Sequence, residues 1–332
     1  MKSPTTLTLN GHRKYQIKTA GLVSFMYPKL NSWVTTFSIV AFDPSNKDLG
    51  VAVHSRYFSV GSIVPWAAAE VGAIATQSFV NASYGPRGLQ LLKEGLAVRE
   101  VIGKLTSQDE ARDYRQLGLV DSKGTAAVFT GKKCLEWAGS KVGKNHAALG
   151  NILAGKEVVE NMSVKFESAK GDLARKLVAA LEAGEAAGGD IRGKQSASLL
   201  VVRKEGGRGG YGDRYIDLRV EDHAMPTEEL RRLLGLSRVY YLIDEAEDKF
   251  TAGDLESALS NLQKAISLNR NIDDAHIDLA LIFMKLGRKE EAIEAFKEAL
   301  RLNPKLKRVI KQLPSVGLMK RDKELFAKLK VT

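Results

Sequence analysis

The feature that most constrains this chain is an internal repeat near its C-terminal end. Gly253 recurs as Gly287, Ala258 as Ala292, Ala265 as Ala299 and Leu268-Asn269 as Leu302-Asn303, each at an offset of 34 residues. In both copies apolar residues follow helical spacing on either side of a glycine turn. A two-helix unit of this length cannot bury its apolar face alone, so the copies must stack. The sequence therefore predicts two stacked helical hairpins over 239–304.

The second copy resembles the tetratricopeptide repeat. The matching positions, where that family places its helix contacts and turns, are Leu279-Ala280, Phe283, Leu286-Gly287, Ala292, Phe296, Ala299 and Pro304. The first copy departs from the pattern, because Lys249 stands at an aromatic position and Arg270 replaces the terminal proline. The resemblance implies a concave surface for a protein or peptide partner. The alternative is a helical hairpin used only for packing.

The net charge of +11 is concentrated at the two ends of the chain. Residues 1–33 carry five bases and no acid, and residues 305–332 carry nine bases against two acids. We interpret 1–34 as a basic leader, either disordered or the product of a mis-annotated start, and 305–332 as a basic capping helix and tail. Because the basicity belongs to the ends and not to a folded face, it argues against a nucleic-acid partner.

Several classes of protein are excluded by what the sequence lacks. No apolar run reaches the roughly 18 residues of a membrane helix, and the N-terminus lacks a signal-peptide pattern, so we expect a cytoplasmic protein with no membrane partner. Cys134 is the only cysteine, and the five histidines are scattered. We therefore predict no disulfide, no metal and no cofactor. The run 206–212 (GGRGGYG) lacks the Lys-Ser/Thr of a phosphate-binding loop.

The segment 35–235 has a different pattern, with β-rich runs at both ends and helical spacing between them. We predict strands over 36–43, 49–54, 71–77, 116–120, 126–130, 198–203 and 214–220. Helical spacing runs from Arg87 to Leu105, and again as a pair over 155–187. Strands, helices and strands in this order favour stacked sheets with helices outside them over a parallel βαβ repeat.

Several motifs in this segment are similar to one prokaryotic family, the domain of unknown function 1028. They are TFSIVAFDP from Thr36, the GVAV-x-SR segment Gly50–Arg56, VGSIVPWA, VGAIATQSFVN with YGPRGL, LGNILAG, AAGGDIRGKQSASLLVV and DRYIDLRVEDH. That family is placed in the N-terminal-nucleophile (Ntn) hydrolase superfamily. The resemblance implies an α+β fold, a four-layer αββα sandwich over 35–235, followed by an all-α tetratricopeptide unit. It implies no substrate, because the family's activity is not established.

The resemblance also implies a catalytic threonine. In the superfamily the first residue of the mature chain is the nucleophile, and its free α-amine, with a pKa of about 7.7–8, is the base. The family position is Thr36, and Thr35 is adjacent. Here 35 residues precede Thr36, and an acylated amine cannot act as a base. Three explanations stay open: a true start near Val34, cleavage of the chain by itself, or a domain that is no hydrolase.

Other candidates follow the predicted strands. Arg56 is a candidate to orient a substrate carboxylate, and Gln77, Ser78, Asn81 and Asn151 are candidates to donate to a developing oxyanion. Their alternative roles are surface ion pairing and turn stabilisation.

Our leading hypothesis is an Ntn-type amidohydrolase acting on a small amide or peptide-like substrate, with repeats that recruit a protein partner or assemble a homo-oligomer. The alternative is a non-catalytic scaffold whose repeats mediate protein–protein interaction.

Overall fold

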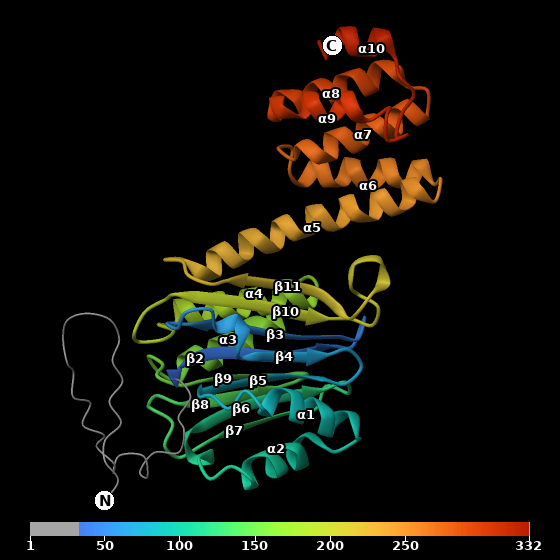
Figure 1. The fold of residues 1–332 in the computed structure, drawn as a ribbon. Coiled ribbons are helices and arrows are strands. Elements are labelled where there is room, and N and C mark those ends of the chain that lie inside the picture. The colour runs from blue at the N-terminus through green and yellow to red at the C-terminus, as the bar shows by residue number, and fades with distance from the viewer. Residues whose placement is uncertain (1–32, 332) are drawn as a thin grey trace, which may run out of the picture.

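The computed structural model describes residues 33–331. It contains a sheet-rich unit followed by a helical unit (Figure 1). The prediction for residues 1–32 of the leader lies outside the described residues, but Trp33–Val34 already form a strand, β1. The leader predicted over 1–34 therefore overlaps the first sheet by two residues.

The sheet-rich unit contains two sheets in which every neighbouring pair is antiparallel. The first sheet has the order β1-β5-β6-β7, with β4 also pairing β5; the second has the order β11-β10-β3-β2-β9-β8. Strands of the first are β1 (Trp33–Val34), β4 (Pro65–Ala68), β5 (Gly72–Phe79), β6 (Arg115–Asp121) and β7 (Ala126–Thr130). Those of the second are β2 (Thr36–Asp43), β3 (Asp48–Ser55), β8 (Gly139–Gly143), β9 (His146–Gly150), β10 (Ser196–Val202) and β11 (Arg214–Val220).

Each sheet is covered on its two faces by different partners. Between the sheets lies an apolar cluster that includes Val40, Val51, Ala75 and Leu149. Helices α3 (Glu157–Ser168) and α4 (Leu173–Ala186) pack on the other face of the second sheet. Helices α1 (Tyr84–Lys93) and α2 (Val98–Ser107) pack on the other face of the first. Burial on both faces explains why the central strands read as continuous apolar runs.

Three predicted strands, 36–43, 126–130 and 214–220, are confirmed at both ends. The helical stretch expected from Arg87 to Leu105 is divided into two helices: α1 ends at Lys93 and α2 begins at Val98. Gly95 separates them with a left-handed φ of 90° that a helix interior cannot adopt. The β8–β9 hairpin was not predicted, because its first strand, GSKVG, lacks apolar alternation.

A single helix, α5 (Pro226–Thr251), belongs to both units. Near its start Leu230 and Leu234 pack into the cluster beneath the second sheet. Further along, Val239 and Ile243 pack against α6 (Leu255–Leu268). A proline at its first position suits a helix start, where the missing amide hydrogen costs nothing. The helix therefore begins well before residue 239, where the first repeat was predicted to start.

The remaining helices form the predicted hairpins. After α6 come α7 (Asp273–Lys285), α8 (Lys289–Leu302), α9 (Lys307–Gln312) and α10 (Lys323–Lys328). Gly253 and Gly287 turn the two hairpins with φ of 83° and 74°, so the recurring glycines share one left-handed geometry. Two short helices, α9 and α10, stand in place of the one predicted capping helix. Ile310 of α9 and Phe326 of α10 pack in the same apolar cluster as residues of α7 and α8.

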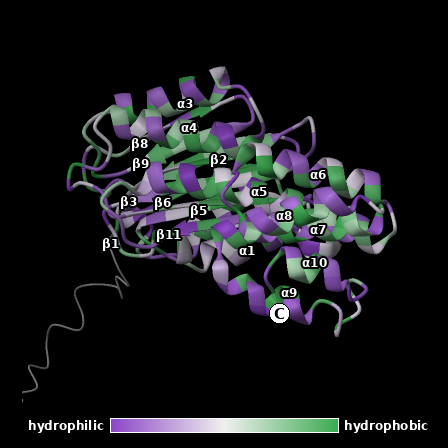
Figure 2. Cartoon of the chain, turned by 90° about the horizontal axis from the view of Figure 1, so that it is seen from above, coloured by the Kyte–Doolittle hydropathy of each residue, from purple (hydrophilic) through white to green (hydrophobic). Residues whose placement is uncertain are grey.

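Seen from above, the strands are mostly hydrophobic, whereas the helices alternate hydrophilic and hydrophobic residues along their length (Figure 2). Within residues 33–331 no helix combines the length and the apolar character needed to cross a bilayer.

Candidate functional site

A polar site lies where β2 begins, between the two sheets. Thr36 pairs with Ser55 of β3, and Val34 pairs with Ser78 of β5. Side chains alternate along a strand, and Val40 and Val53 face the space between the sheets. Thr36 points to the same side of β2 as Val40, and Ser55 points to the same side of β3 as Val53. Both therefore face the space between the sheets.

The carbonyl oxygen of Thr35 accepts two hydrogen bonds from side chains distant in sequence. Ser55 Oγ donates to it at 2.5 Å, and Arg192 Nη2 donates to it at 3.2 Å. On the other side of the Thr35–Thr36 peptide bond, the Thr36 carbonyl accepts from the backbone N–H of Asn151 at 3.0 Å. A guanidinium and a hydroxyl on one carbonyl oxygen polarise that carbonyl toward nucleophilic attack.

The two threonine hydroxyls are buried without partners. Thr35 is 2% exposed and Thr36 is 0% exposed. Neither Oγ1 atom has a hydrogen-bond partner among the residues that the structure describes. An unsatisfied buried polar group costs about 1–3 kcal/mol. The Thr36 hydroxyl thus forms no hydrogen bond to the described residues, and it belongs to the residue that directly follows the polarised Thr35 carbonyl.

Arg192 is held in place by Asp190, which is 4% exposed. The Asp190 carboxylate accepts from Arg192 Nε at 3.0 Å and from Nη2 at 2.6 Å. It also accepts the backbone N–H of Arg192 at 3.0 Å. Sequence reasoning missed both residues, although they belong to the AAGGDIRGKQ segment that carries the family resemblance. The usable signal was an Asp-x-Arg pair flanked by glycines, outside any periodic element.

Side-chain amides form a second buried network beside the threonines. Ser38 Oγ donates to Gln77 Oε1. Gln77 Nε2 and Asn151 Nδ2 donate to Gln116 Oε1 at 2.8 and 2.9 Å. Gln116 Nε2 in turn donates to the carbonyl of Gly150 at 2.8 Å. The network leaves one buried atom without a partner among the described residues, Asn151 Oδ1, which is an acceptor.

Gln77 and Asn151, both candidates for oxyanion donors, bond to the same oxygen of Gln116, and their amide nitrogens are therefore already engaged. Gln116, which joins them, was not singled out from the sequence. Its signal was a polar residue at the start of a predicted buried strand, where an unpaired amide would be costly.

In the described chain the amide network does not include the other predicted candidates. Ser78 is buried with a left-handed φ of 69°. Asn81 donates to Asp109 at 3.0 Å and accepts from the N–H of Ser83 at 3.2 Å, so its side chain fixes the start of α1. Arg56 is exposed beyond the end of β3 and donates to Gln195 Oε1 at 2.6 Å. The partner in this hydrogen bond is a neutral amide and not an acid.

His54 supports the site from the opposite face of β3. Its ring stacks on Phe37 with centroids 4.6 Å apart, and its Nε2 lies 3.6 Å from a carboxylate oxygen of Glu185. Burial lowers the pKa of His54 to about 4; Lys194 acts in the same direction, and Glu185 opposes it. His54 is therefore neutral near pH 7, and it packs behind the strand that carries Thr36.

No group of three or more His, Cys, Asp or Glu side chains lies close enough to hold a metal ion within residues 33–331.

The two packed sheets, the polar threonine site and the helical hairpins define a two-part protein. Residues 36–230, more than half of the chain, match the model of a family of unknown function, DUF1028, so the chain belongs to that family. Residues 273–306 match the tetratricopeptide repeat.

Two solved structures are similar to parts of the chain. Protein SPO2555 from Silicibacter pomeroyi, of the DUF1028 family, shares 33% identity over 60% of this chain and 84% of its own, with a TM-score of 0.56. MamA shares 22% identity over 32% of this chain and 65% of its own, with a TM-score of 0.24. No curated protein matches the chain.

Proposed function

We propose that this protein is an amide hydrolase whose nucleophile is Thr36, made N-terminal by cleavage of the Thr35–Thr36 bond. In this proposal the packed sheets and their outer helices are the four-layer αββα sandwich of the Ntn hydrolases. The observation that carries the proposal is the uncommitted Thr36 hydroxyl beside a carbonyl that Ser55 and Arg192 polarise.

Cleavage would begin with attack of Thr36 Oγ1 on the carbonyl carbon of Thr35. Negative charge then develops on the Thr35 oxygen, where the Arg192 guanidinium and the Ser55 hydroxyl stabilise it. The C–N bond breaks, the hydroxyl proton passes to the Thr36 nitrogen, and the Thr35 acyl group is left as an ester on Oγ1. Water hydrolyses the ester to a Thr35 carboxylate, the free Thr36 hydroxyl and a free α-amine.

The freed Thr36 would then act on a substrate amide by the same chemistry. Its α-amine, with an ordinary pKa of about 7.7–8, takes the proton of Oγ1 and passes it to the leaving amine. The acyl group is held as an ester until water releases it. Arg56 directly follows Ser55, the residue that pairs with Thr36. We assign Arg56 to a substrate carboxylate, because its hydrogen bond is to a neutral amide.

The family match supports the choice of threonine, since it begins at residue 36. The repeat match supports a docking role for the helical unit, because tetratricopeptide repeats bind proteins or peptides.

The test is the mass of the intact protein, expressed from its native gene, beside that of Thr36→Ala and Thr36→Ser. We expect wild type and Thr36→Ser to begin at residue 36 and to react with a β-lactone electrophile. Thr36→Ala should keep its leader and stay unreactive. A wild-type chain that retains residues 1–35 and resists the electrophile would refute the hydrolase.

One observation favours the alternative, a non-catalytic scaffold. In the described chain the nitrogen of Thr36 belongs to a peptide bond, and the preceding residues pair with β5. If the chain is never cleaved, docking by the repeats is the remaining function. The same mass measurement separates the two.

A further inference from the structure

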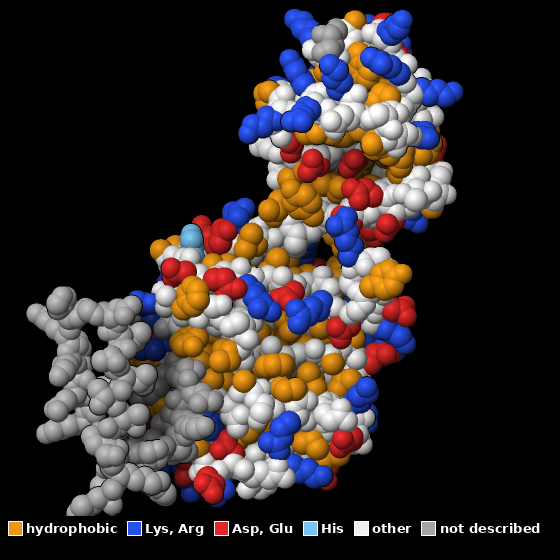
Figure 3. Space-filling model, viewed as in Figure 1, with side chains coloured by type: hydrophobic (Ala, Val, Ile, Leu, Met, Phe, Trp, Pro, Cys, Tyr) orange, Lys and Arg blue, Asp and Glu red, His pale blue; other side chains and the backbone are white. Residues whose placement is uncertain are grey.

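The helical unit carries opposite charges at its two ends. Residues 239–285, which include the end of α5 with α6 and α7, contain nine acids and four bases. Residues 305–332, which include α9 and α10, contain nine bases and two acids. Figure 3 shows this separation on one face: acidic side chains gather among hydrophobic ones near α5–α7, and Lys and Arg surround the C-terminal helices.

The acidic end contains a groove. A cavity of about 270 Å³ is lined by Glu247 and Phe250 of α5, Asp278 and Leu281 of α7, and Leu318. Its floor is apolar, and its two carboxylates stand on neighbouring helices. Asp278 forms no ion pair within residues 33–331, so this carboxyl group of the groove has no basic partner there.

One acid that lines the groove, Glu247, already faces a cation of its own chain. Arg208, on the glycine-rich loop between β10 and β11, lies 2.8 Å from Asp244 and 3.4 Å from Glu247. Arg208 is 74% exposed, so this pair contributes little stability and can be displaced. The contact indicates the chemistry that the acidic wall accepts: a guanidinium or an ammonium beside an apolar surface.

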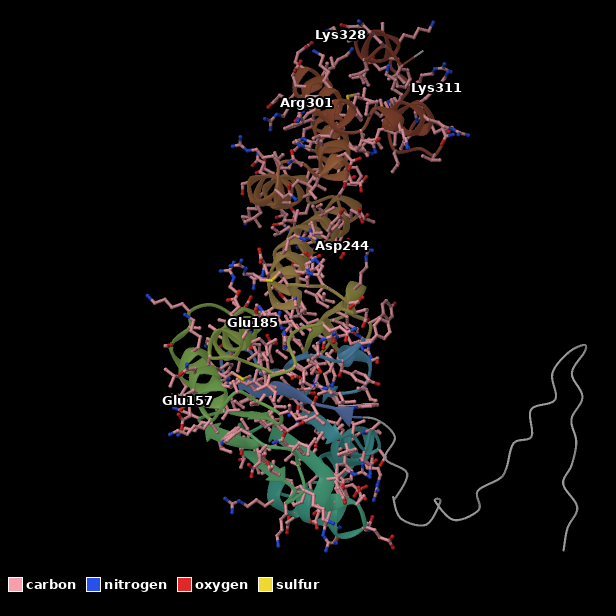
Figure 4. The ribbon with its side chains drawn as sticks, turned by 90° about the vertical axis from the view of Figure 1, so that its left-hand side faces the viewer. Glu157, Glu185, Asp244, Arg301, Lys311 and Lys328 are labelled. Carbon is pink, nitrogen blue, oxygen red and sulfur yellow. The ribbon has the colours of Figure 1, made fainter. Side chains whose placement is uncertain are left out.

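The basic end presents a complementary surface on α9. Lys307, Arg308 and Lys311 are exposed, and Val309 between them is 45% exposed. No acid of the described chain forms an ion pair with any of these three bases. In Figure 4 Lys311 projects from the far end of the helical unit, whereas Asp244 lies toward the sheets.

We propose that the groove formed by α5 and α7 binds the basic face of α9 from a second copy of this chain. Because the two surfaces differ, the contact is head-to-tail, and each added copy leaves one free groove and one free basic face. Charge and apolar side chains are matched on the two surfaces, which is what an electrostatically steered interface requires. This inference is independent of the catalytic proposal.

The experiment is sedimentation velocity of the full chain between about 1 and 100 µM, in low and high salt. We expect the weight-average mass to rise with concentration at 50 mM NaCl and to fall to that of the monomer at 500 mM, because exposed charge pairs are screened. The double variants Glu247→Gln/Asp278→Asn and Lys307→Glu/Arg308→Glu should each raise the apparent Kd at least tenfold. Glu294→Gln, a charge loss on α8 outside the groove, should behave as wild type.

Mixing the two double variants gives the decisive result. Each retains the surface that the other lacks, so the mixture should form a one-to-one dimer and no larger species. A variant that had merely lost its fold would not be rescued in this way. Wild type that stays monomeric at 100 µM in low salt, association insensitive to both variants, or failure of the mixture to pair would each overturn the proposal.

Discussion

Arg192 is the residue through which the tertiary structure acts on the Thr35–Thr36 peptide bond. Its guanidinium is fixed by two hydrogen bonds to Asp190, and its Nη2 also donates to the Thr35 carbonyl. A planar, permanently charged fork held in this way needs no reorganisation when charge develops on the oxygen.

If the proposed cleavage at Thr35 takes place, we expect Arg192→Gln to slow it by about 100-fold, the usual loss when one oxyanion donor is removed. Arg192→Lys should retain part of the rate, because it keeps the charge without the fork. Appearance of the chain that begins at Thr36 would be followed by intact mass. Arg219→Gln, whose partner Asp217 lies on β11, is the matched control. Equal rates for Arg192→Gln and wild type would remove Arg192 from the mechanism.

Asp278 gives a second prediction at this scale. Burial raises its pKa to about 7, and the charges of Glu247 and Asp274 act in the same direction; Arg208 faces Glu247 from the loop. The folded state therefore binds the proton more tightly than the unfolded state, whose pKa is about 3.9. The contribution of Asp278 to stability therefore falls as pH rises from about 4 to 7 and then levels off.

Asp278→Asn removes this cost. We choose 0.5 M NaCl, where the proposed association is screened. There we expect the free energy of unfolding of the variant to exceed that of wild type at pH 8 by on the order of 1–2 kcal/mol, discounted for partial exposure. At pH 4 the two should differ little. Urea unfolding at both pH values measures the difference, and Glu294→Gln serves as the exposed control. A gain that does not depend on pH would mean that Asp278 is not charged in the folded protein.

At the scale of elements, α5 is the part that joins the two units. Its 26 residues span about 39 Å at the usual rise of an α-helix. Its first half is buried against the second sheet and its second half against α6. The repeat pattern revealed only the second half, because the first half packs on a sheet and has no counterpart 34 residues away.

Leu230 of α5 is 0% exposed and packs in the apolar cluster beneath the second sheet. Leu230→Ala should lower the free energy of unfolding by about 2–4 kcal/mol, the range for a large-to-small change in a core. Leu268→Ala, at a side chain 61% exposed, should change it by less than about 0.5 kcal/mol. Urea denaturation of the two variants tests the assignment, and equal losses would contradict it.

At the scale of the whole molecule, the apolar cores of the two units are separate. Three clusters fill the sheet-rich unit, and two others fill the helical unit. No residue within a sheet-side cluster also belongs to a helix-side cluster among the described residues. Units that share only a helix need not unfold together.

We expect calorimetry to resolve two transitions. Phe296, fully buried in the helical unit, contributes to one of them only. Phe296→Ala should lower the free energy of unfolding of the helical unit by about 3–5 kcal/mol. The midpoint temperature of the other transition should stay within a degree or two of wild type. A single transition displaced as a whole by Phe296→Ala would show that α5 makes the two units one cooperative body.

The sequence by itself determined the local features of this protein. The 34-residue period, the hairpin glycines and the strands 36–43 and 214–220 follow from which side chains are apolar and how they are spaced. These properties belong to segments of a few residues, and each segment carries them wherever it lies.

Only the tertiary structure decided which polar groups meet. Ser55, Asn151 and Arg192 bond to Thr35 or Thr36 through strand order, register and one loop, across separations of up to 157 residues. Gln116 joins them through Asn151. Hydrogen bonds depend on distance and direction in space, so no periodic pattern along the chain encodes them. The threonines were recognisable in the sequence, but the groups that polarise the bond between them were not.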